Sequence, residues 1–446
     1  MIVLLFNIII LVVGILTLYN FRAGYLAIFC SKILIPHMVR FGIGSLSLSI
    51  ADVFSLILIV SFIFHRTQLT KGKHYPLILK KYFIIEIVIT LLLIILSSGY
   101  VPYSYQFTSF IKTILQTFVF MWLGYWAFTP IANKRILNII FIVLIGAGFY
   151  GILSYLIKFN PYVDLLYIVY SGEENIYSIF MDEERGGLVG RTSGTMTHPL
   201  GWGQMWNLVI GLYFLYNKNI NKFLGFIIVV IGIINIIFCG SRAAIVALVI
   251  LYIFYLFSLS RKKVFKNLFI ILSLLTMGFF AFRKNENIEK VSKYIQAAVF
   301  FWDQEASNEA EIRGSSVNMR IRQFEVSIEK AASSIGGLGY NYQLYTLNNY
   351  RKADDELYGL ESVIFKKFVE QGFIGMIVFI YTTTLLLKYA RRNEKHKEKV
   401  LITGFFCSYI ATISITGIQG ETWPLFFVII LLFKNRNKIS NNCYDS

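Results

Sequence analysis

The sequence predicts an all-α polytopic membrane protein. Of its 446 residues, 56% are hydrophobic and 15% are charged, whereas soluble globular chains have roughly 45–50% and about 25%. This excess is too large for one bigger soluble core, because such cores stop growing near roughly 250–300 residues. Runs of about 20 apolar residues, the length that crosses a bilayer, recur along the chain. Together these observations exclude a soluble enzyme, a secreted disulfide scaffold and a disordered protein.

These apolar runs predict about twelve membrane-spanning helices. The first run lacks a basic start and a small-residue cleavage site, so we expect a retained helix and not a cleaved signal peptide. A weaker segment, 24–40, contains Lys32 and Pro36 and would be a short thirteenth crossing or an interfacial helix. The expected spans are 2–20, 49–65, 82–98, 107–128, 136–157, 200–216, 223–239, 242–259, 264–282, 363–388, 400–418 and 421–434.

Lysine and arginine concentrate in the connections that fall on one side of this arrangement. Those connections hold 22 Lys and Arg but three Asp and Glu, whereas acidic residues outnumber basic ones in loops 158–199 and 283–362. Because basic loops stay in the cytoplasm, we expect both termini to be cytoplasmic and both long loops to lie outside. The Lys and Arg residues that give the net charge of +17 would then face the cytoplasm and anionic lipid headgroups. The positive charge is therefore explained without a nucleic-acid partner, and none is expected.

The two long loops divide the chain into five expected parts. Within the second loop, residues 319–332 have helical spacing, which predicts an amphipathic helix near the outer membrane surface. The alternative is a purely structural lid. The parts are an N-terminal bundle (1–157), an extracytoplasmic Gly/Arg loop (158–199), a four-helix segment with an outer Ser-Arg turn (200–282), the long extracytoplasmic loop (283–362), and three helices with a basic tail (363–446).

Polar residues suited to chemistry gather at the outer ends of these helices. The glycine-rich segment 186–205 contains Arg191 and His198, which supply donors for phosphate or sugar oxygens; the alternative is a plain turn before a helix. Ser241 and Arg242 lie between two helices placed almost back to back. An ionisable residue at that depth is a functional candidate, and the alternative is an arginine that reaches out to lipid phosphates.

Two glutamates near the end of the long loop are candidates for a general base. Glu361 begins a helix, and Glu370 follows nine residues later with Lys366 and Lys367 between them. Partial desolvation would raise the pKa of such a carboxylate toward the range that a base needs. The alternatives are a helix-start acid favoured by the dipole for Glu361 and a partner for a buried lysine for Glu370. A second group, of supporting residues that could pair across the bundle, consists of Asp52 and Lys112.

Four motifs in this order resemble the O-antigen polymerase and O-antigen ligase family. The resemblance covers about residues 186–380, and the first half of the chain matches in hydropathy alone. The motifs are Arg-x-Ser-Gly-Thr (191–195), Gly-Ser-Arg-Ala-Ala (240–244), Gly-Gly-Leu-Gly-Tyr (336–340) and Glu-Ser-x(7)-Glu-x-Gly-x-x-Gly (361–375).

The resemblance implies a multi-span glycosyltransferase that takes a glycan from undecaprenyl pyrophosphate at the outer face of the bacterial cytoplasmic membrane. A polymerase transfers the glycan to the non-reducing end of a lipid-linked repeat unit, in O-antigen, capsule or exopolysaccharide synthesis. A ligase transfers it to another acceptor. The implied partners are the undecaprenyl-pyrophosphate-linked oligosaccharide, membrane lipid, a chain-length regulator and a flippase, and no cofactor or metal is needed.

Roles for individual residues follow from the resemblance. Arg191 and Arg242 match arginines that hold the pyrophosphate, beside Ser241 and His198, and Arg320 or Arg322 matches a further loop arginine. Ligases of the family commonly have a histidine where this chain has Glu361, which favours a polymerase with Glu361 as the base of an inverting transfer. A lipid-linked oligosaccharide flippase or transporter fits twelve spans equally well, but transporters tend to place binding charges at the bilayer midplane and to show internal repeats.

Overall fold

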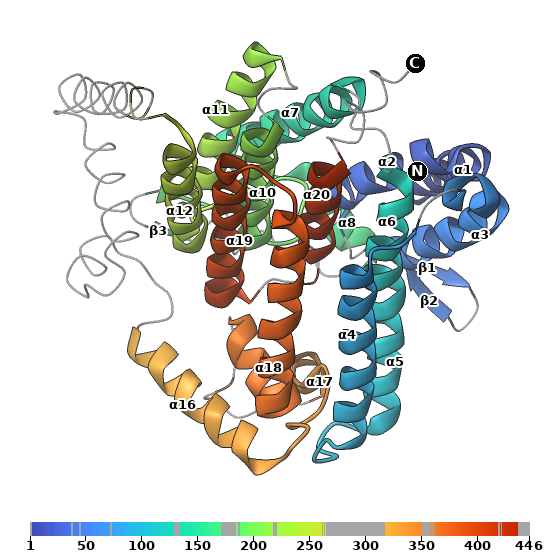
Figure 1. The fold of residues 1–446 in the computed structure, drawn as a ribbon, viewed down its shortest axis with the longest axis vertical. Helices are drawn as coiled ribbons and strands as arrows, with labels where there is room; N and C mark the ends of the chain where they lie inside the picture. Colours follow the sequence, from blue (N-terminus) through green and yellow to red (C-terminus); the bar gives the residue numbers. More distant parts are fainter. Residues whose placement is uncertain are drawn as a thin grey trace.

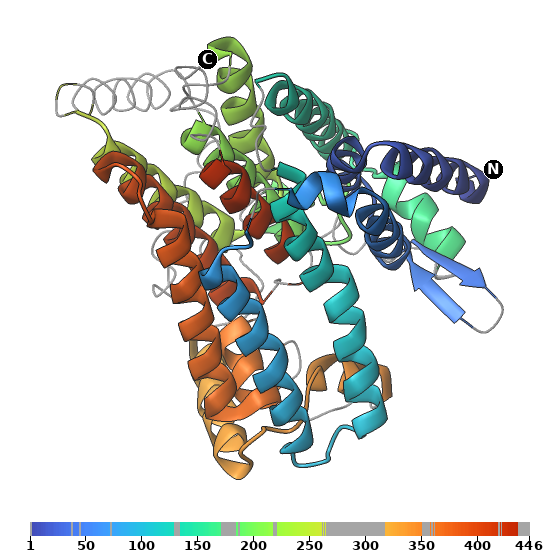
Figure 2. The same ribbon diagram turned by 45° about the vertical axis from the view of Figure 1, so that its right-hand side comes forward.

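The protein is a bundle of helices with two short β-hairpins (Figures 1 and 2). The expected class, a mostly helical membrane protein, is confirmed. The computed structural model describes residues 2–36, 39–43, 46–71, 74–128, 134–170, 184–185, 188–216, 221–260, 317–349, 362–417 and 422–435, with the single residues 262, 264, 357, 360 and 420.

Five stretches of helix in these residues are long and apolar enough to cross a membrane. Shorter apolar helices are Leu4–Tyr19, Lys222–Phe238, Arg242–Ser258 and Trp423–Lys434. The expected count of twelve therefore stays a prediction, and the expected span 264–282 lies outside the described residues. The five candidate spans are Ile50–Thr70, Tyr103–Phe128, Leu137–Leu156, Val363–Arg391 and His396–Thr416.

The helices follow the expected apolar runs closely along most of the chain. Their bounds are α1 Ile2–Tyr19, α2 Phe21–Leu34, α3 Ile50–Thr70, α4 Leu77–Ile95, α5 Tyr103–Thr113, the π-helix η1 Ile114–Val119, α6 Phe120–Phe128, α7 Lys134–Leu156, α8 Pro161–Tyr170, α10 Pro199–Tyr216, α11 Lys222–Phe238, α12 Arg242–Ser258, α16 Val317–Ser333, α17 Tyr342–Asn349, α18 Val363–Arg391, α19 His396–Thr416 and α20 Trp423–Asn435.

Two short segments of this mostly helical chain form hairpins, which the sequence analysis did not predict. Strand β1 (Arg40–Ile43) pairs antiparallel with β2 (Leu46–Ser49), with Arg40 opposite Ser49. Leucine and serine alternate through residues 45–49, and a period of two is typical of a strand. The second hairpin joins β3 (Glu184–Arg185) to β4 (Leu188–Val189). The weak segment 24–40 thus contains most of α2 and the start of β1.

Helix α10 lies at the centre of the bundle, because nearly all of its side chains are apolar and buried. Trp202 and Trp206 are both fully buried on it, and α10 packs against α11, α19 and α12. Beside it, α20 is buried from Trp423 to Phe433 and packs against α6. These two helices join the N-terminal and C-terminal parts of the chain into one core (Figure 1).

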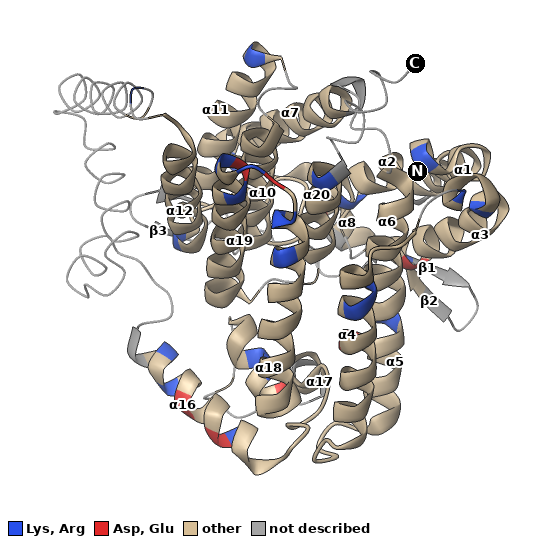
Figure 3. Ribbon diagram, in the orientation of Figure 1, with Lys and Arg blue, Asp and Glu red and all other residues tan. Residues whose placement is uncertain are grey.

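Helices α4, α5 and α18 run together to one end of the molecule, where α16 lies (Figures 1 and 2). The helix expected at 319–332 is present as α16, which packs against α18; its position at a membrane surface stays a prediction. In Figure 3, basic positions lie at the upper ends of α4, α11, α18 and α20, whereas α16 carries both signs. The side of the membrane on which these positions lie stays a prediction.

Candidate functional site

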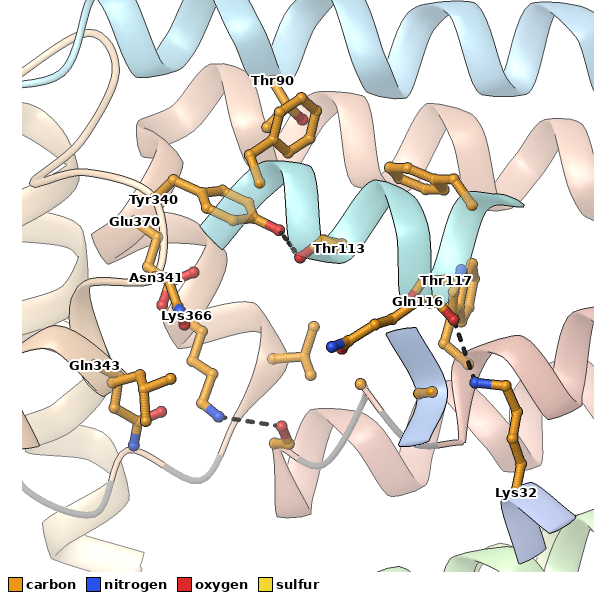
Figure 4. Close-up of a pocket in the computed structure, with 18 of the residues that line it drawn as sticks. Lys32, Thr90, Thr113, Gln116, Thr117, Tyr340, Asn341, Gln343, Lys366 and Glu370 are labelled. Carbon is orange, nitrogen blue, oxygen red and sulfur yellow. Dashed lines mark hydrogen bonds between the residues drawn. The ribbon is translucent and has the colours of Figure 1, made fainter. Parts of the chain in front are cut away.

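A cavity of about 870 Å³ lies between the N-terminal and C-terminal parts of the bundle. Its walls come from α2, α3, α4, α5, η1, α18 and α20, with the loops around residues 196–198 and 340–341 and the start of α17. Hydroxyl, amide and charged groups project into it beside apolar rings (Figure 4). Such a mixture of many neutral donors and a few charges suits the hydroxyl-rich surface of a sugar.

One wall of the cavity is built around Lys32 of α2. Its Nζ donates to the main-chain oxygen of Gln116 over 3.2 Å and lies 4.7 Å from the centre of the Phe120 ring. Gln116 belongs to the π-helix η1, and single π-turns inside α-helices are frequent at functional sites. The Gln116 Nε2 in turn donates to Asp52 Oδ1 over 2.9 Å, so Asp52 fixes the position of the Gln116 side chain in this wall.

Asp52 is also part of the start of α3. It is buried and accepts hydrogen bonds from the backbone N–H and the hydroxyl of Ser49, which closes a capping box. Lys112, the other expected supporting residue, is exposed at the end of α5. In the described part of the chain the Asp52 carboxylate bonds to Ser49 and Gln116 and not to Lys112.

The opposite wall is the first three turns of α18. Lys366 Nζ donates to the main-chain oxygen of Gly417 over 3.2 Å, and Lys367 Nζ donates to Gln371 Oε1 over 2.9 Å. Glu370 lines the cavity near both lysines and accepts hydrogen bonds from the backbone N–H groups of Asn341 and Gln343. This carboxylate therefore fastens the loop 340–343 to α18 (Figure 4).

Tyr340 closes the cavity between these two walls. Its hydroxyl donates to Thr113 Oγ1 over 2.9 Å, and its ring lies edge-on to Phe110. Burial raises the pKa of the Tyr340 phenol, an effect that the hydrogen bond to Thr113 opposes. The phenol is thus a neutral hydrogen-bonding group in the physiological range and not a general base.

The Gly-Gly-Leu-Gly-Tyr motif places Tyr340 by close backbone packing. Leu338 N donates to Val369 O over 2.8 Å, and the backbone N–H of Tyr340 donates to Gln106 Oε1 over 2.8 Å. A side chain at Gly336 would come within 2.3 Å of the Leu93 carbonyl oxygen on α4. The motif therefore wedges the loop between the α4–α5 connection and α18.

The two arginine motifs meet at the turn between α11 and α12. Arg191 is 3% exposed, and its Nε donates to the main-chain oxygen of Cys239 over 2.9 Å. Ser241 caps α12 by accepting from the backbone N–H of Ala244 over 3.3 Å. Arg242 is the first residue of α12 and is half-buried. Neither arginine lines the cavity.

The remaining predicted residues lie in three different places. His198 lines the cavity and accepts from the backbone N–H of Leu200 through Nδ1. On α16, an Arg320 Nη donates to the Ile415 carbonyl oxygen over 2.8 Å, while the exposed Arg322 pairs with Glu325. Glu361 lies outside the described residues; Val363, two residues on, lines the cavity.

Residues 227–380 match the model of the O-antigen ligase family. This segment is an O-antigen ligase family domain. The resemblance inferred from the motifs is thereby confirmed, and with the apolar helices it identifies a polysaccharide-related membrane enzyme. No curated protein matches the chain.

The cavity lies between the O-antigen ligase family domain and the rest of the chain. Lys366, Glu370 and Tyr340 belong to the domain, whereas Lys32 and Gln116 precede it. Sequence patterns missed the role of Lys32 and Gln116 in this cavity, because Lys32 lies in a weakly apolar segment and Gln116 in an unremarkable apolar run. A polar residue inside an otherwise apolar helix was the available signal. Among the described residues, no three His, Cys, Asp or Glu are grouped to hold a metal ion.

Proposed function

We propose that the protein is a polysaccharide polymerase at the outer face of the bacterial cytoplasmic membrane. It transfers a growing glycan from undecaprenyl pyrophosphate to the non-reducing end of a lipid-linked repeat unit. The observation that carries the proposal is a cavity in which hydroxyl, amide and charged groups lie among apolar side chains, and whose α18 wall belongs to an O-antigen ligase family domain. The cavity would hold the sugars, while the lipid tails remain among the helices.

The reaction needs two kinds of group. As the acceptor hydroxyl attacks the sugar carbon, a base takes its proton, and the bond to the pyrophosphate oxygen breaks with inversion. In this proposal the base is Glu361, because Val363, two residues further along the chain, lines the cavity, and Gln343, which also lines it, donates through Nε2 to the Leu360 carbonyl oxygen over 3.0 Å. The developing charge on the leaving pyrophosphate is stabilised by a guanidinium, which offers paired donors to phosphate oxygens.

The structure supports different roles for the two outer arginines. Arg191 is buried against the α11–α12 turn and bonds to its main chain, so we propose that it positions the turn. Arg242 begins α12 on the same turn and is less buried, so we propose that it binds the pyrophosphate. Loop 191–198 connects this turn to the cavity, because Met196, Thr197 and His198 line it.

A ligase is the second candidate, and the name of the matched family favours it. Its acceptor would be another lipid or a protein in place of the lipid-linked repeat unit. Glu361, where ligases of the family commonly have a histidine, supports the polymerase. The two activities leave different glycans when they are lost, so one genetic experiment separates them.

The test is the length distribution of surface glycan after deletion of the gene. Loss of a polymerase leaves single repeat units exported, loss of a ligase leaves long chains on the lipid carrier, and loss of a flippase leaves the units inside the cell. Complementation with Glu361→Gln is expected to restore protein level but not chain length. Glu329→Gln, an exposed carboxylate on α16, is the matched control. Normal chain length with Glu361→Gln would contradict the role of Glu361 as the base.

A further inference from the structure

We propose that one face of α4 is a sugar-binding subsite, in which Glu86 accepts a hydrogen bond from a hydroxyl group of the glycan. This inference deepens the proposed function and rests on it. Glu86 is then a specificity-determining residue, because it favours a sugar that offers a hydroxyl at this position over one that carries a carboxylate there or lacks the hydroxyl. It lies outside the segment 227–380 that matches the family.

Glu86 is a charged residue in the middle of an apolar helix. Helix α4 runs from Leu77 to Ile95, and from Tyr82 to the end of the helix Glu86 is the one charged side chain. An ionisable side chain in such a helix is costly to bury and is by default a candidate for function. Glu86 is half-buried and lines the cavity, so it borders the space in which the sugars are proposed to bind.

One oxygen of this carboxylate has a partner, and the other does not. Oε1 accepts from the hydroxyl of the buried Thr382 on α18 over 2.5 Å. Among the residues that the structure describes, Oε2 accepts no hydrogen bond and Glu86 forms no ion pair. An ionised carboxylate offers about four acceptor positions, and one that lacks partners away from water is destabilising. A hydroxyl of the bound glycan would supply the missing donor.

Two further polar side chains continue this face of α4. Tyr82 and Thr90 lie one turn before and one turn after Glu86, so the three side chains share a face at a spacing of about 5–6 Å. All three line the cavity, and Thr90 is labelled in Figure 4. The Tyr82 hydroxyl accepts from Trp423 Nε1 over 3.1 Å, whereas within the described part of the chain the Thr90 hydroxyl forms no hydrogen bond. The face thus presents a row of oxygen atoms to an occupant.

Glu370, the other carboxylate at the cavity, already has a structural role. It accepts hydrogen bonds from the backbone N–H groups of Asn341 and Gln343, which Glu86 has no counterpart for. Both carboxylates act on the Tyr340 phenol, whose pKa is raised by burial first and then by the charges of Glu370 and Glu86. The two therefore border one space, and Glu86 is the one that remains for a ligand.

Aromatic rings around this face suit the apolar side of a sugar ring. Phe110, Phe379 and Trp423 line the cavity of about 870 Å³, and sites for small molecules typically combine such rings with a few convergent polar groups. A sugar carboxylate beside Glu86 would meet a like charge. A sugar that lacks the hydroxyl would leave Glu86 unpaired, and a site built to bond a hydroxyl discriminates strongly against such an analogue.

Calorimetric titration of the purified full-length protein in nanodiscs tests this subsite. The probe is the oligosaccharide repeat unit released by partial hydrolysis of the surface glycan of the wild-type strain. In Glu86→Gln the amide oxygen can still accept from Thr382, but the amide nitrogen then faces the cavity and cannot accept. We expect this variant to bind the probe about tenfold more weakly with an unfolding midpoint close to that of the wild type. Glu329→Gln, exposed on α16, should bind as the wild type does.

A role of Glu86 in joining α4 to α18 predicts a different result. In that case Glu86→Gln and Thr382→Val lower the unfolding midpoint and leave the dissociation constant of the probe unchanged. Thr90→Val, which keeps the side-chain shape and removes one hydroxyl of the same face, gives a second measurement if Glu86→Gln does not fold. We expect it to weaken binding about threefold or more.

Three outcomes overturn the proposal: no binding of the probe to the wild-type protein, an unchanged dissociation constant in folded Glu86→Gln, and an unchanged dissociation constant in Thr90→Val. None of them depends on glycan transfer. Glycan length in the deletion strain tests the polymerase separately, because that readout does not depend on which residue binds the sugar.

Discussion

The backbone of Gly337 lies directly against the backbone of Gly372. Both residues have positive φ, 70° and 64°, and Gly372 interrupts the helical geometry inside α18. A Cβ at Gly337 would come within 2.7 Å of Gln371 N, and one at Gly372 within 2.7 Å of the Ile335 carbonyl oxygen. This contact joins the Gly-Gly-Leu-Gly-Tyr loop to α18 and thereby fixes the cavity wall.

Replacing either glycine with alanine should therefore damage this junction. Gly337→Ala and Gly372→Ala each combine a left-handed conformation with a clash against main chain, and we expect a destabilisation of about 2 kcal/mol or more. The measurement is the midpoint of thermal unfolding in detergent, beside glycan length in cells. Gly146→Ala on α7, where a Cβ meets nothing within 4 Å, is the control and should be neutral or slightly stabilising. Unchanged stability of both test variants would contradict the packing described for this loop.

Gln106, on α5, forms hydrogen bonds both to the connection between α4 and α5 and to the loop that contains Tyr340. Its Nε2 donates to Ser97 Oγ and the Val101 carbonyl oxygen, its Oε1 accepts from Tyr340 N, and it is fully buried. Gln106→Leu keeps the approximate size but leaves buried groups without partners, which costs about 1–3 kcal/mol. We expect a lower unfolding midpoint and slower glycan elongation, measured on the same preparations. Gln68→Leu, exposed on α3, should change neither quantity.

Arg191 and Arg242 should respond differently to substitution. Arg191→Lys loses the Nε donor to Cys239 in a buried position, so we expect lower thermal stability together with shorter glycan. Arg242→Lys keeps a charge at the start of α12 but loses paired donation to a phosphate, so we expect normal stability with elongation reduced about tenfold or more. Chain-length profiles and unfolding midpoints of the two variants make the comparison. Full elongation in Arg242→Ala would remove the pyrophosphate role.

We expect the Tyr340 phenol to make a contribution to stability that depends on pH. Burial raises the pKa of its phenol in the folded protein above the value of about 10 in an unfolded chain. Its stabilising contribution is therefore complete below about pH 10 and is lost as the pH rises toward the folded pKa. The wild-type unfolding midpoint should fall more steeply between pH 9 and pH 11 than that of Tyr340→Phe. Tyr19→Phe, exposed on α1, should follow the wild-type curve; identical curves for wild type and Tyr340→Phe would show that this phenol makes no such contribution.

Hydropathy predicted most helices, because each apolar run is long enough to form one and no water is available to satisfy an open backbone. It also placed α16, whose apolar residues recur with helical spacing. Hydropathy did not predict the hairpin β1–β2 or the π-helix η1, since both are local changes of hydrogen bonding within otherwise apolar sequence. The kink at Gly372 had one indication in the sequence, which is the glycine at this position of the motif 361–375.

The candidate site was predicted in part. Arg191 lies against the turn that contains Ser241 and Arg242, and His198 and Glu370 line the cavity, while the roles expected for these residues stay predictions. Motif order gave no information about Lys32, because its role depends on how α2 packs beside η1. A contact between segments more than eighty residues apart is a property of the bundle and not of either segment's sequence.

The division of the cavity between two parts of the chain has a consequence for evolution and for engineering. Residues on α2 and η1 can change without altering α18 or the turn at Arg242, so under the proposed function a new sugar preference could arise while the residues proposed for bond breaking are inherited intact. Exchanging the first 128 residues between relatives would then transfer the choice of polymer, whereas residues 227–380 expressed by themselves would have only half a binding chamber.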